Sequence, residues 1–109
     1  MTVDSIKRTK VFRTMRSSLI DRLERSGNDT PYYLDLVNDY MNMYITKELC
    51  NHDIADRGVS ITSVGSTGQL ITKKNESVNL LLRTNQQMIK LLDMLGIKPE
   101  TGYEDDGEL

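Results

Sequence analysis

Residues 78–95 carry the pattern that most restricts how this chain can fold, because apolar positions recur there at alternating spacings of three and four. The positions that share this repeat are Val78, Leu81, Leu82, Asn85, Met88, Ile89, Leu92 and Leu95. Such a repeat predicts an amphipathic helix whose apolar stripe packs against another helix. Asn75 or Ser77 can cap its start, whereas Gly96 and Pro99 favour its end.

A second long helix is predicted upstream of this one. Thr30 can cap its first turn, and Pro31 suits the first helical position, where the missing N–H would have been unpaired anyway. Gly58 should end this helix, which gives about 27 residues and a length of about 40 Å, with Asp53 facing water. Before it, the segment from Asp4 to Ser26 repeats apolar residues at helical spacings without glycine or proline, and so predicts a single amphipathic helix.

The connector between the two long helices, residues 58–72, has a different character. It is rich in β-branched residues and is interrupted by Gly65 and Gly68. It is therefore either a loop or a short hairpin that turns between these glycines.

These segments together predict an all-α fold with three parts. A basic N-terminal helix occupies residues 1–27, an antiparallel helical hairpin with a glycine-rich connector occupies 28–98, and a flexible acidic tail occupies 99–109. Leu80, Leu91 and Met94 form a second apolar line on the later helix. A two-helix hairpin cannot cover apolar stripes of this width, so the first helix or other copies of the chain must bury the remainder. We expect both, with the copies associating as a homo-oligomer through residues 28–98. The residues expected at the oligomer interface are Leu81, Asn85, Met88 and Leu92. A monomeric three-helix bundle is the alternative.

Asn85 differs from its neighbours in the repeat because it places an amide in an apolar stripe. A buried amide costs stability unless it is hydrogen-bonded, but across a helix interface it can fix the register and the number of copies. We therefore expect Asn85 to form a hydrogen bond across a helix interface.

The composition limits the classes of protein to which the chain can belong. Its 109 residues suffice for one domain, and no apolar run approaches the roughly 20 residues that a membrane span requires. The single cysteine, Cys50, cannot form an internal disulfide, which agrees with a reducing compartment. We therefore expect a soluble protein that is not secreted and does not act at a membrane.

Residues suited to catalysis or metal binding are scarce. His52 lies one turn from Glu48 and Asp56, a spacing that suits acid–base chemistry but more often marks a solvated helix face. His52 and Cys50 are two residues apart on a helix, so they point in different directions and cannot share a metal. The turn near Gly65 lacks the lysine of a phosphate-binding loop. We therefore predict no catalytic residue, no metal and no cofactor, with an enzyme built around His52 as the alternative.

The N-terminal segment has the strongest charge pattern. Residues 1–26 hold seven basic residues against three acidic ones. Lys7, Lys10, Arg13 and Arg16 recur every third residue, so they fan across about 180° of a continuous helix. With hydroxyl groups among these charges, the pattern predicts contacts to the phosphate backbone of double-stranded DNA. An ordinary solvated helix face is the alternative.

Lys73 and Lys74 form a second basic pair, at the exit of the connector. They are further candidates for contacts to DNA or to a neighbouring acidic surface, and simple exposure is the alternative. The acidic residues in 99–109 could repel DNA, compete with it for the basic helix, or bind a basic partner.

Three stretches of the chain resemble the terminase small subunit of tailed bacteriophages, in particular a branch of short all-helical chains. They are DTPYYLDLVNDYM, Arg57–Val59 and KKNESVNLLLRTNQQMIKLLDMLGIKP. The resemblance covers Asp29 to Pro99, and the block of the third helix is its most specific part. The chain departs from many small subunits because no helix-turn-helix is recognisable before the helical hairpin.

The resemblance implies a non-enzymatic DNA-packaging protein in the host bacterial cytoplasm. It implies a ring-like homo-oligomer that binds double-stranded viral DNA and recruits or regulates the terminase large subunit, which holds the ATPase and the nuclease. Residues 99–109 then become a candidate contact for the large subunit or the procapsid. The alternative function is a helical adaptor that binds a partner protein without a nucleic-acid role.

Overall fold

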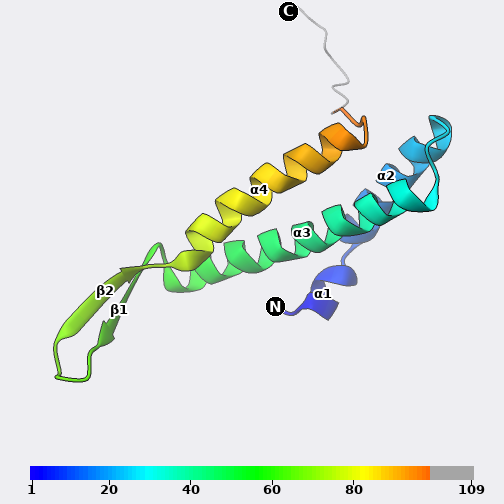
Figure 1. The fold of residues 1–109 in the computed structure, drawn as a ribbon. Coiled ribbons are helices and arrows are strands. Elements are labelled where there is room, and N and C mark those ends of the chain that lie inside the picture. The colour runs from blue at the N-terminus through cyan, green and yellow to red at the C-terminus, as the bar shows by residue number, and fades with distance from the viewer. Residues whose placement is uncertain (99–109) are drawn as a thin grey trace, which may run out of the picture.

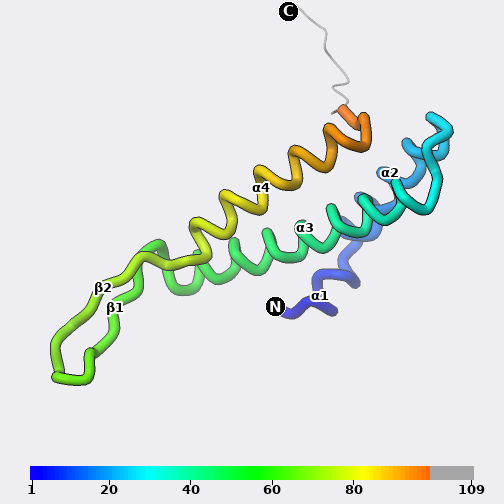
Figure 2. Tube along the Cα trace, viewed as in Figure 1, coloured from blue at the N-terminus to red at the C-terminus, as the bar shows by residue number. Residues whose placement is uncertain are grey.

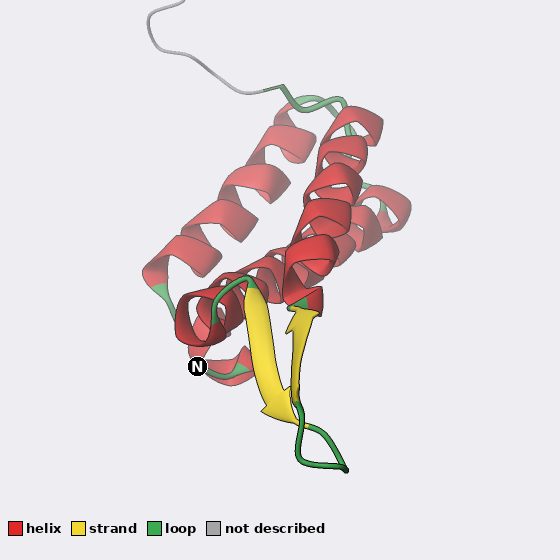
Figure 3. Cartoon of the chain, turned by 90° about the vertical axis from the view of Figure 1, so that its left-hand side faces the viewer, coloured by secondary structure: helices red, strands yellow, loops and turns green. Residues whose placement is uncertain are grey.

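The computed structural model describes residues 1–98, so the acidic tail expected in residues 99–109 lies outside the described residues. The elements, in chain order, are α1 (Val3–Lys7), α2 (Lys10–Arg25), α3 (Pro31–Arg57), β1 (Ser60–Val64), β2 (Leu70–Lys74) and α4 (Glu76–Met94). The long helices α3 and α4 lie side by side and antiparallel, with α2 against α3 (Figure 1). The trace in Figure 2 shows that α4 ends near the connection between α2 and α3. The two strands extend beyond the helices as a projecting hairpin (Figure 3).

The N-terminal segment forms two helices, so the single helix expected from Asp4 to Ser26 is wrong. Thr9 separates α1 from α2 because its backbone is extended, with φ −70° and ψ 151°. The Thr9 hydroxyl accepts a hydrogen bond from the backbone N–H of Phe12 at 3.2 Å and donates one to the carbonyl of Ile6 at 2.8 Å. Threonine can replace backbone helix bonds in this way, and the spacing of apolar residues does not reveal it.

The two long helices have the predicted boundaries. Helix α3 starts at Pro31 and stops before Gly58, whose positive φ of 82° suits glycine. Asn75 caps α4, because its side-chain oxygen accepts a hydrogen bond from the backbone N–H of Ser77 at 2.9 Å. Gly96, with φ 70°, follows the end of α4.

The connector forms a two-stranded antiparallel sheet, so the expectation of an all-α fold is wrong, whereas the hairpin alternative for this segment is confirmed. Ser60 lies opposite Lys74, and the register continues to Val64 opposite Leu70. The β-branched residues between them favour the extended backbone. Gly65 closes the turn, because its N–H donates to the carbonyl of Gln69 at 2.7 Å.

One hydrophobic core joins α1, α2, α3 and the residues that follow α4. Its buried members are Ile6, Phe12, Leu19, Leu23, Val37, Met41, Ile45, Leu95 and Ile97. Phe12 also contacts the ring of Tyr44, with centroids 6.2 Å apart. Because the core fixes one side of α2 against α3, the opposite side of α2 is left facing solvent.

Candidate nucleic-acid and subunit interfaces

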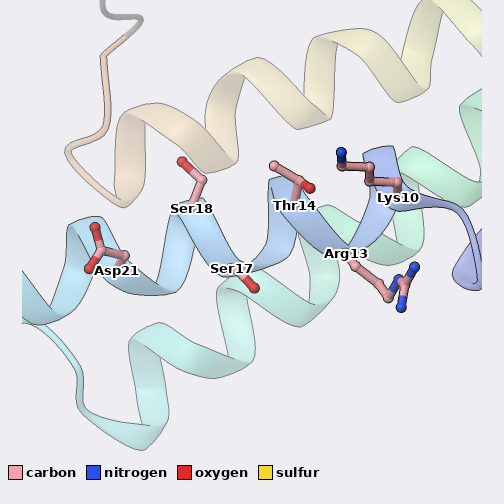
Figure 4. A pocket seen from close by; sticks show the side chains of 6 residues that line it. All are labelled: Lys10, Arg13, Thr14, Ser17, Ser18 and Asp21. Atoms are coloured by element: carbon pink, nitrogen blue, oxygen red, sulfur yellow. The ribbon is translucent and has the colours of Figure 1, made fainter.

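The solvent-facing side of α2 forms a shallow hollow of about 550 Å³. Its lining residues are Lys10, Arg13, Thr14, Ser17, Ser18 and Asp21, and all six are exposed. In Figure 4, Lys10, Thr14 and Ser18 follow one edge of this surface, while Arg13 and Ser17 follow the other. The hollow therefore combines cations with hydroxyl donors, which is the chemistry that binds phosphate oxygens.

The four predicted DNA-contacting cations of the N-terminal segment all face solvent. Lys7 lies on α1, whereas Lys10, Arg13 and Arg16 lie on α2 and span about 120° of that helix. Among residues 1–98, none of these four side chains forms an ion pair with a carboxylate. We call Lys7, Lys10, Arg13 and Arg16 the basic surface; its charge is available to an anionic partner.

Asp21 is the carboxylate at the edge of the hollow. It pairs with Arg25 one turn later, with the Arg25 Nε atom 3.0 Å from a carboxylate oxygen. Both side chains are more than half exposed, so the pair contributes little to stability. The neighbouring cation nevertheless offsets the negative charge of Asp21 next to the basic surface.

Lys73 and Lys74 are exposed at the base of the hairpin, on β2. They line a second hollow, of about 340 Å³, with Arg57, Ile61, Ser63 and Glu76. The hairpin leaves the far end of the α3–α4 pair and points away from α2 (Figure 1). The structure therefore separates these two lysines from Lys10 and Arg13 within one chain.

Asp53 has more partners than the sequence pattern indicated, because we expected it only to face water and its side chain is 27% exposed. Its carboxylate accepts hydrogen bonds from Arg57 at 2.6 and 2.9 Å, from the Asn75 amide at 3.0 Å and from the Ser77 hydroxyl at 2.7 Å. The Arg57 bonds, followed by those from Ser77 and Asn75, hold the pKa of Asp53 well below its usual range. Helical spacing cannot show these partners, since Asn75 and Ser77 come from a later element.

Asn75 ties the hairpin to both long helices. Its side chain is fully buried, and its amide also donates to the carbonyl of Gly58 at 2.9 Å. Its backbone N–H donates to the carbonyl of Val59 at 2.8 Å. We call Asp53, Arg57, Asn75 and Ser77 the junction cluster; it joins the end of α3, both ends of the hairpin and the start of α4.

Helix α4 carries two apolar stripes, whose members differ from those that the sequence indicated. The first stripe packs inside the chain and comprises the half-buried Leu81 and the buried Thr84, Met88, Leu91 and Leu95. The second is more exposed and comprises Val78, Leu82, Asn85, Ile89 and Leu92. Leu82 is 57% and Ile89 68% exposed, whereas Val78, Asn85 and Leu92 are half-buried and Leu92 packs against the core, so the chain by itself leaves Leu82 and Ile89 in water. We call it the outer stripe.

The predicted interface residues divide between the two stripes. Asn85 and Leu92 are half-buried in the outer stripe, whereas Met88 is only 5% exposed within the single chain. Asn85, Met88 and Leu92 border a groove of about 320 Å³ between α3 and α4, whose other lining residues are Tyr40, Lys47 and Ile89.

The residues considered for catalysis do not converge on a site. His52 is exposed on α3, and burial followed by the nearby Asp53 charge raises the pKa of the Cys50 thiol, contrary to what a nucleophile requires. Within residues 1–98, no three side chains of the His, Cys, Asp or Glu type gather as metal ligands. In that same part of the chain, no helix has the length and apolar character to cross a membrane.

Comparison with known proteins identifies the family. A family model described as the small subunit of phage terminase matches residues 13–102, which include α3, the hairpin and α4. No curated protein and no solved structure matches the chain. Terminase small subunits act in the packaging of phage DNA, so the match assigns the chain to that process. The chain therefore belongs to the family of phage terminase small subunits.

Proposed function

We propose that this small subunit binds double-stranded viral DNA through its basic surface and, without catalysing a reaction itself, recruits or regulates the terminase large subunit. The observation that carries the proposal is the set of four exposed cations that have no carboxylate partner among residues 1–98. Viral DNA packaging also implies that the protein acts in the host bacterial cytoplasm. Residues 99–109, which the structure does not describe, are a candidate contact for the large subunit.

The physical basis is the release of counterions from DNA. Each cation that neutralises a phosphate releases bound salt ions, so affinity falls with rising salt concentration. Thr14, Ser17 and Ser18 lie among the cations of α2 and can donate hydrogen bonds to phosphate oxygens. Contacts of this kind orient a protein on DNA without reading its sequence.

Several copies acting together would strengthen such contacts. We propose that the outer stripe packs on other copies of the chain and builds a ring-like homo-oligomer, with Asn85 and Leu92 at the interface. Leu81 and Met88 belong to the other stripe of α4, which packs inside the chain. A ring would present several basic surfaces to one duplex, and their combined binding exceeds that of one surface.

The experiment replaces Lys7, Lys10, Arg13 and Arg16 with Gln and titrates a DNA duplex at several salt concentrations. We expect the slope of log K against log salt to lose about 3.6 in magnitude, from four contacts at about 0.9 each. The matched control is Lys90→Gln with Lys98→Gln, two exposed lysines outside α1 and α2.

The control variant should bind as the unmodified protein does, and both variants should keep the mass of the unmodified oligomer. Unchanged DNA affinity and slope in the variant of the basic surface would overturn the proposal. Binding of a partner protein alone would support the adaptor alternative instead.

A further inference from the structure

The β1–β2 hairpin has a surface unlike that of the rest of the chain. No aspartate or glutamate occurs between Asp56 and Glu76, although the chain contains 16 acidic residues. Within this stretch Lys73 and Lys74 are exposed and have no ion-pair partner among the described residues. The hairpin is therefore a positively charged projection on a protein of net charge −2.

One face of the hairpin is exposed over its whole length. Side chains alternate between the two faces of a strand, so every second residue of each strand shares this face. Its members are Ser60, Thr62 and Val64 on β1 and Leu70, Thr72 and Lys74 on β2. The hydroxyls of Thr62 and Thr72 lie 3.0 Å apart and hydrogen-bond across the strands. The opposite face carries the half-buried Ile61 and Ile71 together with the exposed Ser63 and Lys73.

The junction cluster gives the hairpin a defined direction. A two-stranded hairpin by itself is marginally stable in water. Here buried Asn75, which follows β2, bonds to Gly58, which precedes β1, and to Asp53 of α3. These bonds hold the base of both strands against the helices, so the exposed face is presented in a fixed orientation.

We propose that this hairpin is a second DNA-contacting element, which lies in the major groove of a duplex with its exposed face toward the bases. The major groove, about 12 Å wide, admits a two-stranded ribbon. Lys74, on the exposed face, then contacts a phosphate, the threonine hydroxyls face base edges, and the apolar pair at the tip meets thymine methyl groups. Val64 and Leu70, 70% and 74% exposed, form that tip pair. The inference rests on the proposed DNA-binding function and adds a separate surface to it.

The test replaces Lys73 and Lys74 with Gln and titrates the same duplex over the same salt range. We expect the slope of log K against log salt to fall by about 0.9 in magnitude, from the phosphate contact of Lys74. Lys90→Gln with Lys98→Gln again serves as the charge-matched control. At saturating protein, methylation of guanine N7, an atom of the major groove, should be suppressed less by the hairpin variant than by the unmodified protein.

Each outcome separates this inference from the proposed function. If the Lys73→Gln, Lys74→Gln variant keeps the full slope while the variant of the basic surface loses it, the hairpin inference is overturned and the proposed function stands. If the hairpin variant loses affinity only because its oligomer mass changes, the hairpin contacts another copy of the chain, and the inference also fails. If the unmodified protein does not bind DNA at all, both proposals fall.

Discussion

At the scale of single residues, Asp53 shows how a position that the sequence pattern assigns to the surface can join several elements of the molecule. Its carboxylate receives hydrogen bonds from α3 itself and from the start of α4. Charge-assisted bonds of this kind are stronger than neutral ones and depend on the carboxylate staying ionised. The junction cluster should therefore respond to pH.

We expect Asp53→Asn to lower the free energy of unfolding, and to do so less as the solution becomes acidic. The pKa of Asp53 is lowered in the folded chain, so its ionisation stabilises the fold fully above the ordinary carboxyl pKa, about 3.9. This contribution is lost as the pH falls from there toward the folded-state pKa. Urea unfolding of both proteins between neutral and acidic pH measures the difference.

Asp39→Asn is the matched control for that comparison. Asp39 is exposed on the same helix and makes no hydrogen bond or ion pair through its side chain within residues 1–98. Its replacement should change stability little at any pH. If Asp53→Asn lowers the free energy of unfolding by the same amount over the whole pH range, that result would contradict the account of the junction cluster.

At the scale of elements, the sequence was sufficient to predict the boundaries of both long helices. Pro31, Gly58, Asn75 and Gly96 are signals that act within one turn of the chain, and the helix boundaries follow them. The structure of the connector could not be chosen from the sequence, because β-branched residues with two glycines suit both a loop and a hairpin. Pairing between strands depends on contacts that single-sequence patterns only suggest.

The division of the N-terminal segment and of the α4 surface could not be predicted in the same way. Thr9 interrupts a helix through its own side-chain bonds, while the apolar spacing continues across it. On α4, a run of leucines offers two stripes, and only the position of α3 decides which one is buried. The candidate DNA-contacting residues were predicted from charge alone, but their separation into two surfaces required the fold.

The outer stripe of α4 leads to a prediction about assembly. We expect Asn85→Leu to raise the thermal stability of the assembled protein, because leucine suits an apolar interface better than an amide does. The same change should broaden the distribution of oligomer masses, because the amide no longer favours one register. Native mass spectrometry of both proteins, with a thermal unfolding curve for each, measures the two effects.

Gln86→Leu supplies the control for this comparison, since Gln86 is an exposed amide on the same helix outside the outer stripe. It should leave the mass distribution unchanged. A single unchanged mass in Asn85→Leu would show that Asn85 does not specify the number of copies.

At the scale of the whole molecule, the fold separates three surfaces. The basic surface lies on α1 and α2, the outer stripe on α4, and the positively charged hairpin projects from the far end of the α3–α4 pair (Figure 1). Assembly through α4 would leave the other two surfaces free to contact a duplex. On the proposed function, this arrangement would let a chain with a net charge of −2 bind DNA, because its positive charge is concentrated on particular faces.

The most direct test of this account is the salt dependence of duplex binding by the unmodified protein. Four phosphate contacts from the basic surface predict that log K falls linearly with log salt, with a slope of at least about 3.6 in magnitude. Lys74 of the hairpin would increase that magnitude further. No measurable binding at low salt, or an affinity that does not change with salt, would contradict the central claim that this protein engages DNA through its exposed cations.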